Sequence, residues 1–360
     1  MSIQGRDYSL TGPENARAVE CGLANATWYK TAIPRKRLKE LMQRSDGPAT
    51  HDTVLWLGSM LVFASCGIAL WGTWWALPFF MAYGVLYGSA GDSRWHECSH
   101  GTAFKTAWKN DLVYQIACFM MMRNPVTWKW SHARHHTDTL IVGRDIEIAV
   151  KRPPNLCLIA LSFIGVIDVY HAMKTMLMNA TGHMRAEDKD YVPENEWSKI
   201  YQVARIWTAI YTVTIATSLS VGSWLPLVLI GLPRIYGAWH HVLTGLIQHA
   251  GLAEDTLDHR LNSRTCYMNP VSQFIYWNMN YHLEHHMFPM VPYHRLPELH
   301  EAMEKDCPPP YPTMLAAYQE IIPALKRQLT DPSYYIKRPL PNPATPETPT
   351  TNSHHFITAA

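Results

Sequence analysis

Cysteine is scarce in this sequence, and no two cysteines form a Cys-x-x-Cys motif. The seven cysteines, at positions 21, 66, 98, 118, 157, 266 and 307, provide no disulfide framework and favour a reducing compartment. The net charge is only +2, which argues against a bulk acidic partner and against nucleic acid. The polar N-terminus lacks the apolar stretch of a cleavable signal peptide, so we expect none.

Charged side chains are missing from two long stretches. No Asp, Glu, Lys or Arg occurs from Thr53 to Gly91, which is too long for one membrane span and suits two spans of about 20 residues. Ile206 to Pro233 is also uncharged, and its apolar character continues to Ile247 with Arg234 as an interruption. A buried hairpin in a soluble protein is the weaker alternative, because soluble cores seldom need such a long uncharged run.

Glycine and tryptophan lie near the middle of both stretches. The segments 71–75 (Trp-Gly-Thr-Trp-Trp) and 222–224 (Gly-Ser-Trp) are typical of tight turns at the far face of a membrane. Pro226 and Pro233 are expected to bend the last span. We therefore predict an all-α membrane protein with four transmembrane helices in two hairpins, interfacial helices and a cytoplasmic His-rich cap. The predicted spans are about 53–72, 74–92, 203–222 and 224–247.

The remaining segments are expected outside the spans. Residues 110–122 are apolar but too short to cross, and residues 155–178 contain charged side chains, so we interpret the first as interfacial and the second as interfacial or covered by protein. A basic cluster over residues 30–44 is either a solvated helix face or a cytoplasmic anchor, and the apolar region after it favours the anchor. The predicted segments are a cytoplasmic N-terminal segment over 1–50, a membrane domain over 51–300, a cytoplasmic C-terminal segment over 301–337 and a disordered Pro-rich tail over 338–360.

Histidine is abundant, with 19 residues, and three short motifs concentrate it. They are His96-Glu97-Cys98-Ser99-His100, His132-Ala133-Arg134-His135-His136 and His282-Leu283-Glu284-His285-His286. On a helix, a spacing of three or four residues places side chains on one face, so their ring nitrogens can converge. One such pair alone is more often a surface accident than a ligand set. Three motifs are hard to explain in that way, and eight imidazoles exceed what one tetrahedral zinc can use, so we predict two metals.

The order and spacing of these motifs resemble those of the integral-membrane fatty acid desaturase and hydroxylase superfamily. Residues 280–289 (Asn-Tyr-His-Leu-Glu-His-His-Met-Phe-Pro) are similar to the acyl-desaturase form of the third motif, and residues 95–101 are similar to the first. The resemblance covers roughly residues 50–300. It implies four transmembrane helices and a di-iron site on the cytoplasmic face. It also implies that dioxygen and two electrons are used to desaturate or hydroxylate an unactivated C–H bond.

The resemblance further implies which residues bind the metals. Besides the motif histidines, the family uses a histidine just after the last span, and His249 fits that place. The family often has an asparagine one turn earlier, where this chain has Gly245, and Gln248 is a candidate substitute. The expected ligands are His96, His100, His132, His135, His136, His249, His282, His285 and His286.

Ligating histidines usually donate their other ring N–H to a carboxylate or carbonyl. For every carboxylate in this role a surface salt bridge is the alternative. Other histidines follow no motif spacing: His240 and His241 are expected to be structural or outer-shell groups, while His171, His183, His259, His294 and His300 are expected to be solvated or capping residues. Cys98 is expected to pack rather than to bind metal. The candidate partners of the ligands are Glu97, Asp138, Asp145, Glu147, Gln248, Asp258, Asn280 and Glu284.

From these features we predict a multi-pass integral membrane enzyme with its active site on the cytoplasmic face. Its cofactors would be two Fe ions, with O2 as co-substrate, and it would introduce a C=C bond into an acyl chain or acyl-like metabolite. The assignment of iron depends on the resemblance, since imidazoles alone do not select iron over zinc or copper. A hydroxylase or ketolase of the same superfamily is the alternative, and a membrane zinc hydrolase or metal transporter is weaker. The chain lacks a haem-binding His-Pro-Gly-Gly motif and a cysteine cluster, so a separate ferredoxin or b-type cytochrome, with its reductase, is expected as electron donor.

Overall fold

The computed structural model describes residues 5–341, and within them the chain is helical with no β-strand. Two isolated β-bridges, Thr265 to Tyr281 and Cys266 to Tyr311, tie loops together. The α-helices are α1 (Pro13–Glu20), α2 (Arg35–Leu41), α3 (Asp46–Ala69), α4 (Ala76–Gly88), α5 (Ala90–Ser99), α6 (Ala107–Met121), α7 (Pro125–Asp138), α8 (Leu156–Ser162), α9 (Val166–Ala180), α10 (Ala186–Tyr191), α11 (Trp197–Ser220), α12 (Leu225–Leu229), α13 (Pro233–Tyr236), α14 (Trp239–His249), α15 (His259–Asn262), α16 (Pro270–Tyr276), α17 (His282–Met287), α18 (Leu296–Met303) and α19 (Met314–Gln328).

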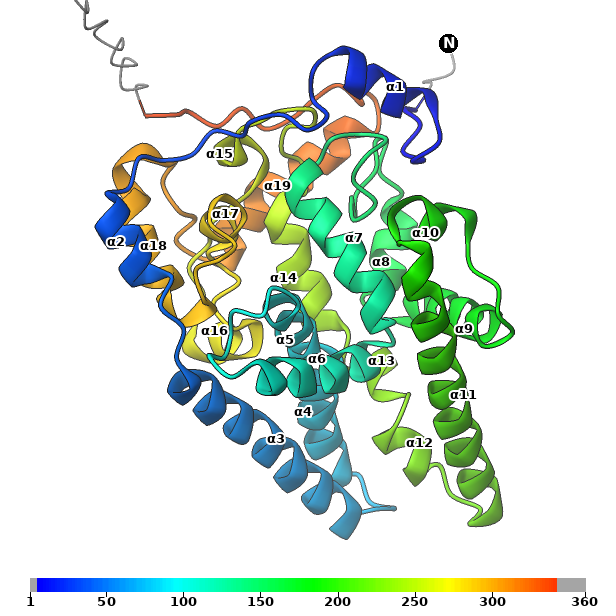
Figure 1. Cartoon of the computed structure of the whole chain (residues 1–360). Helices are drawn as coiled ribbons and strands as arrows, with labels where there is room; N and C mark the ends of the chain where they lie inside the picture. Colours follow the sequence, from blue (N-terminus) through cyan, green and yellow to red (C-terminus); the bar gives the residue numbers. More distant parts are fainter. Residues whose placement is uncertain (1–4, 342–360) are drawn as a thin grey trace, which may run out of the picture.

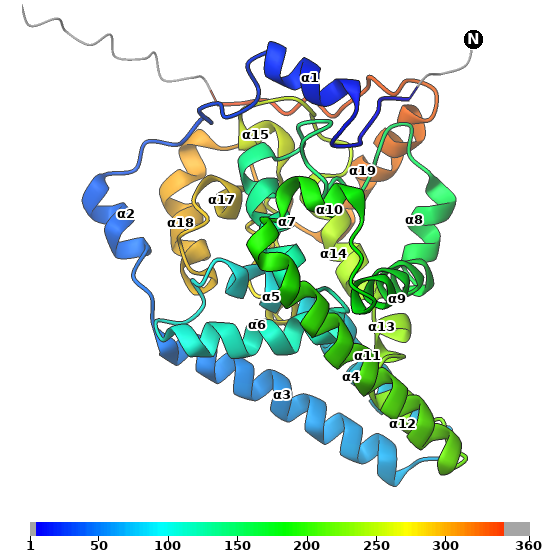
Figure 2. The ribbon, with the colours of Figure 1, turned by 45° about the vertical axis from the view of Figure 1, so that its right-hand side comes forward.

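Two hairpins extend from one side of the molecule (Figures 1 and 2). The first joins α3 to α4, and the second joins α11 to α12, with both turns at the same end. Each turn contains a glycine with positive φ, at Gly72 and Gly222. The tips carry exposed tryptophans, with Trp74 89% and Trp224 69% exposed. Tryptophan prefers the interface between water and lipid, so this arrangement agrees with tips at a membrane surface.

Only part of the predicted membrane topology is visible as long apolar helices. Among the described residues, one helical stretch, 35–69, is both long and apolar enough to cross a membrane. The pair α8 and α9 would add a second if it counted as one span, although it is bent by 81°. Helix α11 has 24 residues, but its serines and threonines and the charges of Lys199 and Arg205 dilute its apolar character. Four transmembrane helices therefore remain a prediction.

The segment predicted as the fourth span is not one helix but three short ones, α12, α13 and α14. Pro226 and Pro233 each stand in the first turn of a new helix, because proline cannot donate the backbone hydrogen bond of a helix interior. Helix α13 then packs very closely against α4. A Cβ atom on Gly237 would lie 1.8 Å from the carbonyl oxygen of Gly84, so only glycine fits at that crossing.

The second predicted span is also interrupted. Helix α4 ends at Gly88, and α5 begins at Ala90 after a break at Ser89. The Ser89 hydroxyl donates to the Gly237 carbonyl at 2.6 Å and accepts from the backbone N–H of His241 at 2.9 Å. This break turns the chain from the hairpin into the helix that carries the first histidine motif.

The surface of the hairpins is rich in exposed apolar side chains. Val62 on α3 is 58% exposed, and Val213 on α11 is 63% exposed. Helix α8, within the stretch predicted as interfacial or covered by protein, has no buried residue, and Leu158 is 47% exposed. Ile159 of α8 and the following Phe163 pack partly against the core, so protein covers this helix on one face only, and its interfacial position stays a prediction.

The remaining helices form a cap at the opposite end from the hairpin tips (Figure 1). Helix α6 lies between the two levels, and Val113, Tyr114, Ala117 and Met121 of its inner face are buried. Arg338, where the predicted disordered tail begins, is packed against the cap. That side chain is 9% exposed and donates to the carbonyls of Ser263 at 3.1 Å and Pro309 at 3.2 Å. The rest of the predicted tail, 342–360, lies outside the described residues.

Candidate metal centre

The histidine motifs meet inside the cap, where they form two separate groups. Five residues make the first group, and four make the second; within each group the candidate ligand atoms lie within 4.8 Å of one another. The first group, called the five-histidine group below, is His96, His100, His132, His136 and His285, and the second, the four-histidine group, is His135, His249, His282 and His286.

Helix geometry explains why neighbouring histidines belong to different groups. Residues i and i+4 project from nearly the same side of a helix, whereas adjacent residues are about 100° apart. His132 and His136 of α7 therefore share one group while His135 turns to the other. On α17, His282 and His286 share the four-histidine group while His285 turns to the five-histidine group. Each His-x-x-His-His motif thus supplies both groups.

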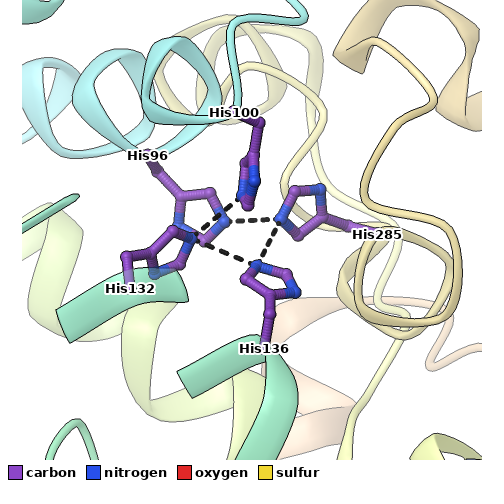
Figure 3. Close-up of side chains that lie close together, drawn as sticks. All are labelled: His96, His100, His132, His136 and His285. Carbon is purple, nitrogen blue, oxygen red and sulfur yellow. Dashed lines mark hydrogen bonds between the residues drawn. The ribbon is translucent and has the colours of Figure 1, made fainter. Parts of the chain in front are cut away.

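The five-histidine group brings together three elements (Figure 3). His96 lies on α5 and His100 follows its last residue, while the others come from α7 and α17. The Nε2 atoms of His96 and His285 are 2.7 Å apart, those of His100 and His132 are 3.1 Å apart, and those of His136 and His285 are 3.2 Å apart. These rings converge on one small volume.

The four-histidine group is built in the same way around the end of α14. The Nε2 atom of His282 lies 3.0 Å from that of His249 and 2.9 Å from that of His286. The ring of His135 completes the group, with its centroid 4.8 Å from that of His286. The two groups are also adjacent, because the rings of His136 and His286 stack at 4.5 Å.

Several of these rings are held from behind at Nδ1. Glu147 faces His132 at 3.2 Å, and Asp145 faces His135 at 2.8 Å. His249 donates to the backbone carbonyl of Asn262 at 2.7 Å. A neutral imidazole that donates from Nδ1 keeps its lone pair on Nε2. In His132 and His249 these lone pairs face neighbouring Nε2 atoms at 3.1 and 3.0 Å, an arrangement that a bound cation satisfies and that the rings cannot satisfy alone.

Burial keeps most of the rings in the neutral, metal-binding form. Desolvation lowers the pKa of His100 to about 4 and that of His249 to about 3. It also holds the pKa of His285 well below its usual range, with further repulsion from neighbouring histidines. Burial acts in the same direction on His135, but the Asp145 carboxylate outweighs it and raises the pKa to about 9. The donor set therefore fits two cations, one in each group.

Among the predicted partners of the ligands, Asp145 and Glu147 each contact a motif histidine, whereas Asp138 contacts none. Asp138 is paired with Arg144, at 3.0 Å, and within residues 5–341 it makes no hydrogen bond to a histidine. Asp258 caps α15 and pairs with Arg260. Arginine thus neutralises the negative charges of these two aspartates. Their ion pairs hold loops of the cap and do not orient imidazoles.

The two glutamates inside the motifs point away from both groups. Glu97 is fully buried and accepts from Thr102 at 2.7 Å and from the backbone N–H of Tyr293 at 3.0 Å. Glu284 accepts from Thr265 and from His300, whose Nδ1 is 2.6 Å away. On a helix these positions project opposite the ligands, so they anchor α5 and α17 to the rest of the cap.

The two predicted amide partners differ in their positions. Asn280 donates to the carbonyl of Cys266 at 3.0 Å and positions the loop before α17. Gln248 donates to the Tyr276 hydroxyl and lines a cavity of about 80 Å³ that also touches His96 and His249. Gln248 is therefore close to both groups, as its candidate role requires.

Two histidines expected to be solvated or capping are buried instead. His300 is 6% exposed and bonded to Glu284. His259 is 3% exposed, stacks on Trp28 at 4.3 Å and lies 5.2 Å from the ring of His286. Neither follows a motif spacing, so no sequence pattern indicates their burial. His240 and His241 are buried next to Ser272 and Arg234, at 3.1 Å and 3.3 Å, away from both groups, and Cys98 is packed in the core.

Comparison with known families agrees with this geometry. Residues 48–318 match the family model described as fatty acid desaturase. The chain belongs to the fatty acid desaturase family. Membership of this family implies an oxygen-dependent oxidoreductase. The match spans every helix that carries a predicted ligand, from α5 to α17.

A more distant similarity points in the same direction. Over 132 residues this desaturase family member is 28% identical to the Delta(12)-acyl-lipid-desaturase of Punica granatum, a match that covers 34% of this chain and 32% of that enzyme. Because only about a third of each chain is covered, this relative supports the family and does not define the substrate.

Proposed function

We propose that this protein is a membrane di-iron desaturase that uses O2 and two external electrons to introduce a C=C bond into an acyl chain or acyl-like substrate. The observation that carries the proposal is the division of the histidines into two adjacent groups of five and four. A single hydrolytic zinc usually uses about three protein ligands and one water, so this set is too large for that role.

Iron is proposed on the basis of the family and of the reaction that the site must support. Cleaving an unactivated C–H bond is beyond acid and base side chains and needs a redox metal with dioxygen. When bound, two irons would supply that oxidising power. The protein's own part is to hold the imidazoles rigidly: Asp145 and Glu147 fix His135 and His132, and the Asn262 carbonyl fixes His249.

We further propose that the two hairpins cross the bilayer and that the cap faces the cytoplasm. The exposed apolar sides of α3 and α11 and the tryptophans at the tips support this orientation. Helix α2 carries basic residues and lies at the edge of the cap (Figure 1), where it is near the surface that an acidic electron donor or anionic lipid would meet. The donor is a separate ferredoxin or b-type cytochrome.

The test is to purify the full chain after expression with iron and a ferredoxin system, and to measure metal content and products together. We expect about two irons per chain and a product that has lost two hydrogen atoms. A product that has gained one oxygen atom would identify the hydroxylase alternative. Stoichiometric zinc in protein from iron-supplied cells, with no oxidised product, would contradict the proposal.

A further inference from the structure

Beside the histidine groups lies a series of adjoining cavities with polar walls. An outer cavity of about 240 Å³ lies among α6, α7, α9, α11 and α13. A second cavity, of about 360 Å³, shares Arg123, Trp128 and Asp168 with the outer one. It also shares Glu147 and Gln248 with the small cavity that touches His96, His132, His135 and His249. Through these shared residues the three cavities adjoin one another, from α9 to histidines of both groups.

The walls of these cavities combine apolar side chains with charged ones. Charged residues line them on several sides, with Asp92 and Glu147 near the histidines and Arg123, Asp168 and Arg234 further out. A hydrocarbon placed against these groups would deprive them of water without replacing its hydrogen bonds, which is costly. The walls instead match a ligand that is itself polar over part of its length.

Four buried polar atoms along this route lack a hydrogen-bond partner in the described part of the chain. They are Thr127 Oγ1, Asn179 Oδ1 and Arg234 Nη1, which belong to residues of the outer cavity, and His241 Nδ1, which belongs to the second. Arg234 is 3% exposed and Asn179 is 1% exposed. Buried polar atoms are nearly always paired, so a cluster of unpaired ones marks a place where a polar group binds.

The charges of the outer cavity indicate an anion. Arg185 is held by both carboxylate oxygens of Asp188, at 2.5 and 2.9 Å, and Arg123 is held by Asp92 at 2.7 Å. Arg234 has only weak contacts, at 3.4 Å with Asp168 and 3.3 Å with His241. Both distances exceed the usual range of about 2.7–3.2 Å. The guanidinium of Arg234 is therefore the least neutralised positive charge of the wall, and a planar carboxylate matches it.

We propose that Arg234 binds the carboxylate of the substrate in the outer cavity, and that the reactive carbon reaches the histidine groups through the second cavity, so that the substrate is a short carboxylic acid rather than a long acyl lipid. The acidic residues Asp92 and Glu147 at the inner end disfavour the reverse orientation, because they would repel a carboxylate there. The inference rests on the proposed function, since it names the substrate of the same site.

The test measures binding directly and does not require turnover. The purified, metal-loaded full chain in detergent is titrated with hexanoate, hexylammonium, hexanol and octadecanoate, and the dissociation constants are compared. We expect hexanoate to bind at least about tenfold more tightly than hexylammonium or hexanol, as the loss of a charge-assisted pair implies. Equal binding of all three hexyl compounds, or a preference for octadecanoate, would overturn the inference.

Three variants separate the role of Arg234 from a structural one. Arg234→Gln should weaken hexanoate binding about tenfold or more, whereas Arg185→Gln, at the rim of the same cavity, should change it by less than about twofold because Asp188 already occupies that guanidinium. Asp168→Asn removes the carboxylate that competes for Arg234 and should tighten binding. Asp168 is 40% exposed in its side chain, so this variant can be read even if Arg234→Gln does not fold. Unchanged or weaker binding in Asp168→Asn would contradict the proposal.

The outcome also distinguishes this inference from the proposed function. Desaturation of a long acyl lipid by an iron-loaded enzyme that ignores hexanoate would refute the carboxylate site and leave the desaturase proposal intact. Specific binding of hexanoate to a chain that holds no iron and oxidises nothing would support the carboxylate site and refute the desaturase proposal.

Discussion

Replacement of Asp145 by asparagine should weaken one metal site and spare the other. The two carboxylate oxygens of Asp145 accept three hydrogen bonds: from His135 Nδ1 at 2.8 Å, from the Leu140 N–H at 2.9 Å and from the Glu147 N–H at 2.8 Å. An asparagine has one acceptor oxygen, so in either orientation its NH2 group faces a donor. If it faces His135, the imidazole must change tautomer and loses its lone pair on Nε2.

The expected loss of metal affinity follows from the role of Asp145 as the group that orients His135. Loss of a group that holds a ligating histidine typically costs 10–100-fold in metal affinity, or about 1.4–2.8 kcal/mol. His135 belongs to the four-histidine group, so the loss should be confined to one of two metals. Because Asp145 raises the pKa of His135 to about 9, a proton competes with metal at neutral pH. The comparison is therefore best made at a pH of about 9.5, where most of this competition has been removed.

The assay is metal retention against increasing chelator, measured by elemental analysis of the re-isolated protein. Asp145→Asn should release one of its two metals at a chelator concentration roughly 10–100-fold lower than the wild type requires, and the other metal at an unchanged concentration. Asp138→Asn is the matched control, since Asp138 is equally buried but pairs with Arg144. Equal retention in Asp145→Asn and wild type would refute the reasoning, as would equal losses in the two variants.

Further expectations can be checked with similar material. His135→Ala should abolish product formation while the protein still inserts in membranes, as judged by carbonate extraction and mass spectrometry; full turnover would contradict its role. Removal of metal by chelation should lower the melting temperature measured by fluorescence, because buried imidazole lone pairs are left facing one another; an unchanged melting temperature would count against metal at these groups. In a denaturation assay, Gly237→Ala should destabilise the protein by about 1–3 kcal/mol or prevent folding, since its Cβ would collide with Gly84. Gly245→Ala is the control and should be close to neutral, because no atom lies within 4 Å of the added Cβ. A cysteine introduced at the exposed tip residue Trp74 should react with a membrane-impermeant thiol reagent only from the side opposite to Cys21; labelling of both from one side would contradict the hairpin topology.

The sequence predicted the helical class and the convergence of the histidines, and it failed where long-range packing decides. Motif spacing was sufficient because the i, i+4 geometry is local: His132 and His136 must share a face wherever α7 lies. The partners of those rings were harder to assign, because Asp138 and Asp145 have the same chemistry and Asp138, which does not contact the ring, is the nearer of the two to His135 in sequence. Their roles diverge only because Arg144 folds back on Asp138 and leaves Asp145 to His135.

The breaks in the second and fourth predicted spans have a related cause. Hydropathy reports how apolar a segment is and not where its helix must stop. Ser89 interrupts one segment because its hydroxyl bridges to Gly237 and His241, which lie 148 and 152 positions away. His259 was misjudged for the same reason, since the Trp28 ring on which it stacks comes from the N-terminal segment, far away in sequence.

Gly245 connects the metal centre with the proposed substrate route. The family resemblance leads one to expect an asparagine there, one helical turn before His249, and the position faces both the small cavity at the histidines and the second cavity. A Cβ at this position would meet no atom within 4 Å, so packing does not demand glycine. The missing side chain leaves the passage between the two cavities wider, while Gln248 provides a polar group one residue from His249. If the proposed carboxylate site is correct, this space lets a polar substrate approach the metals, which would explain the departure from the family pattern.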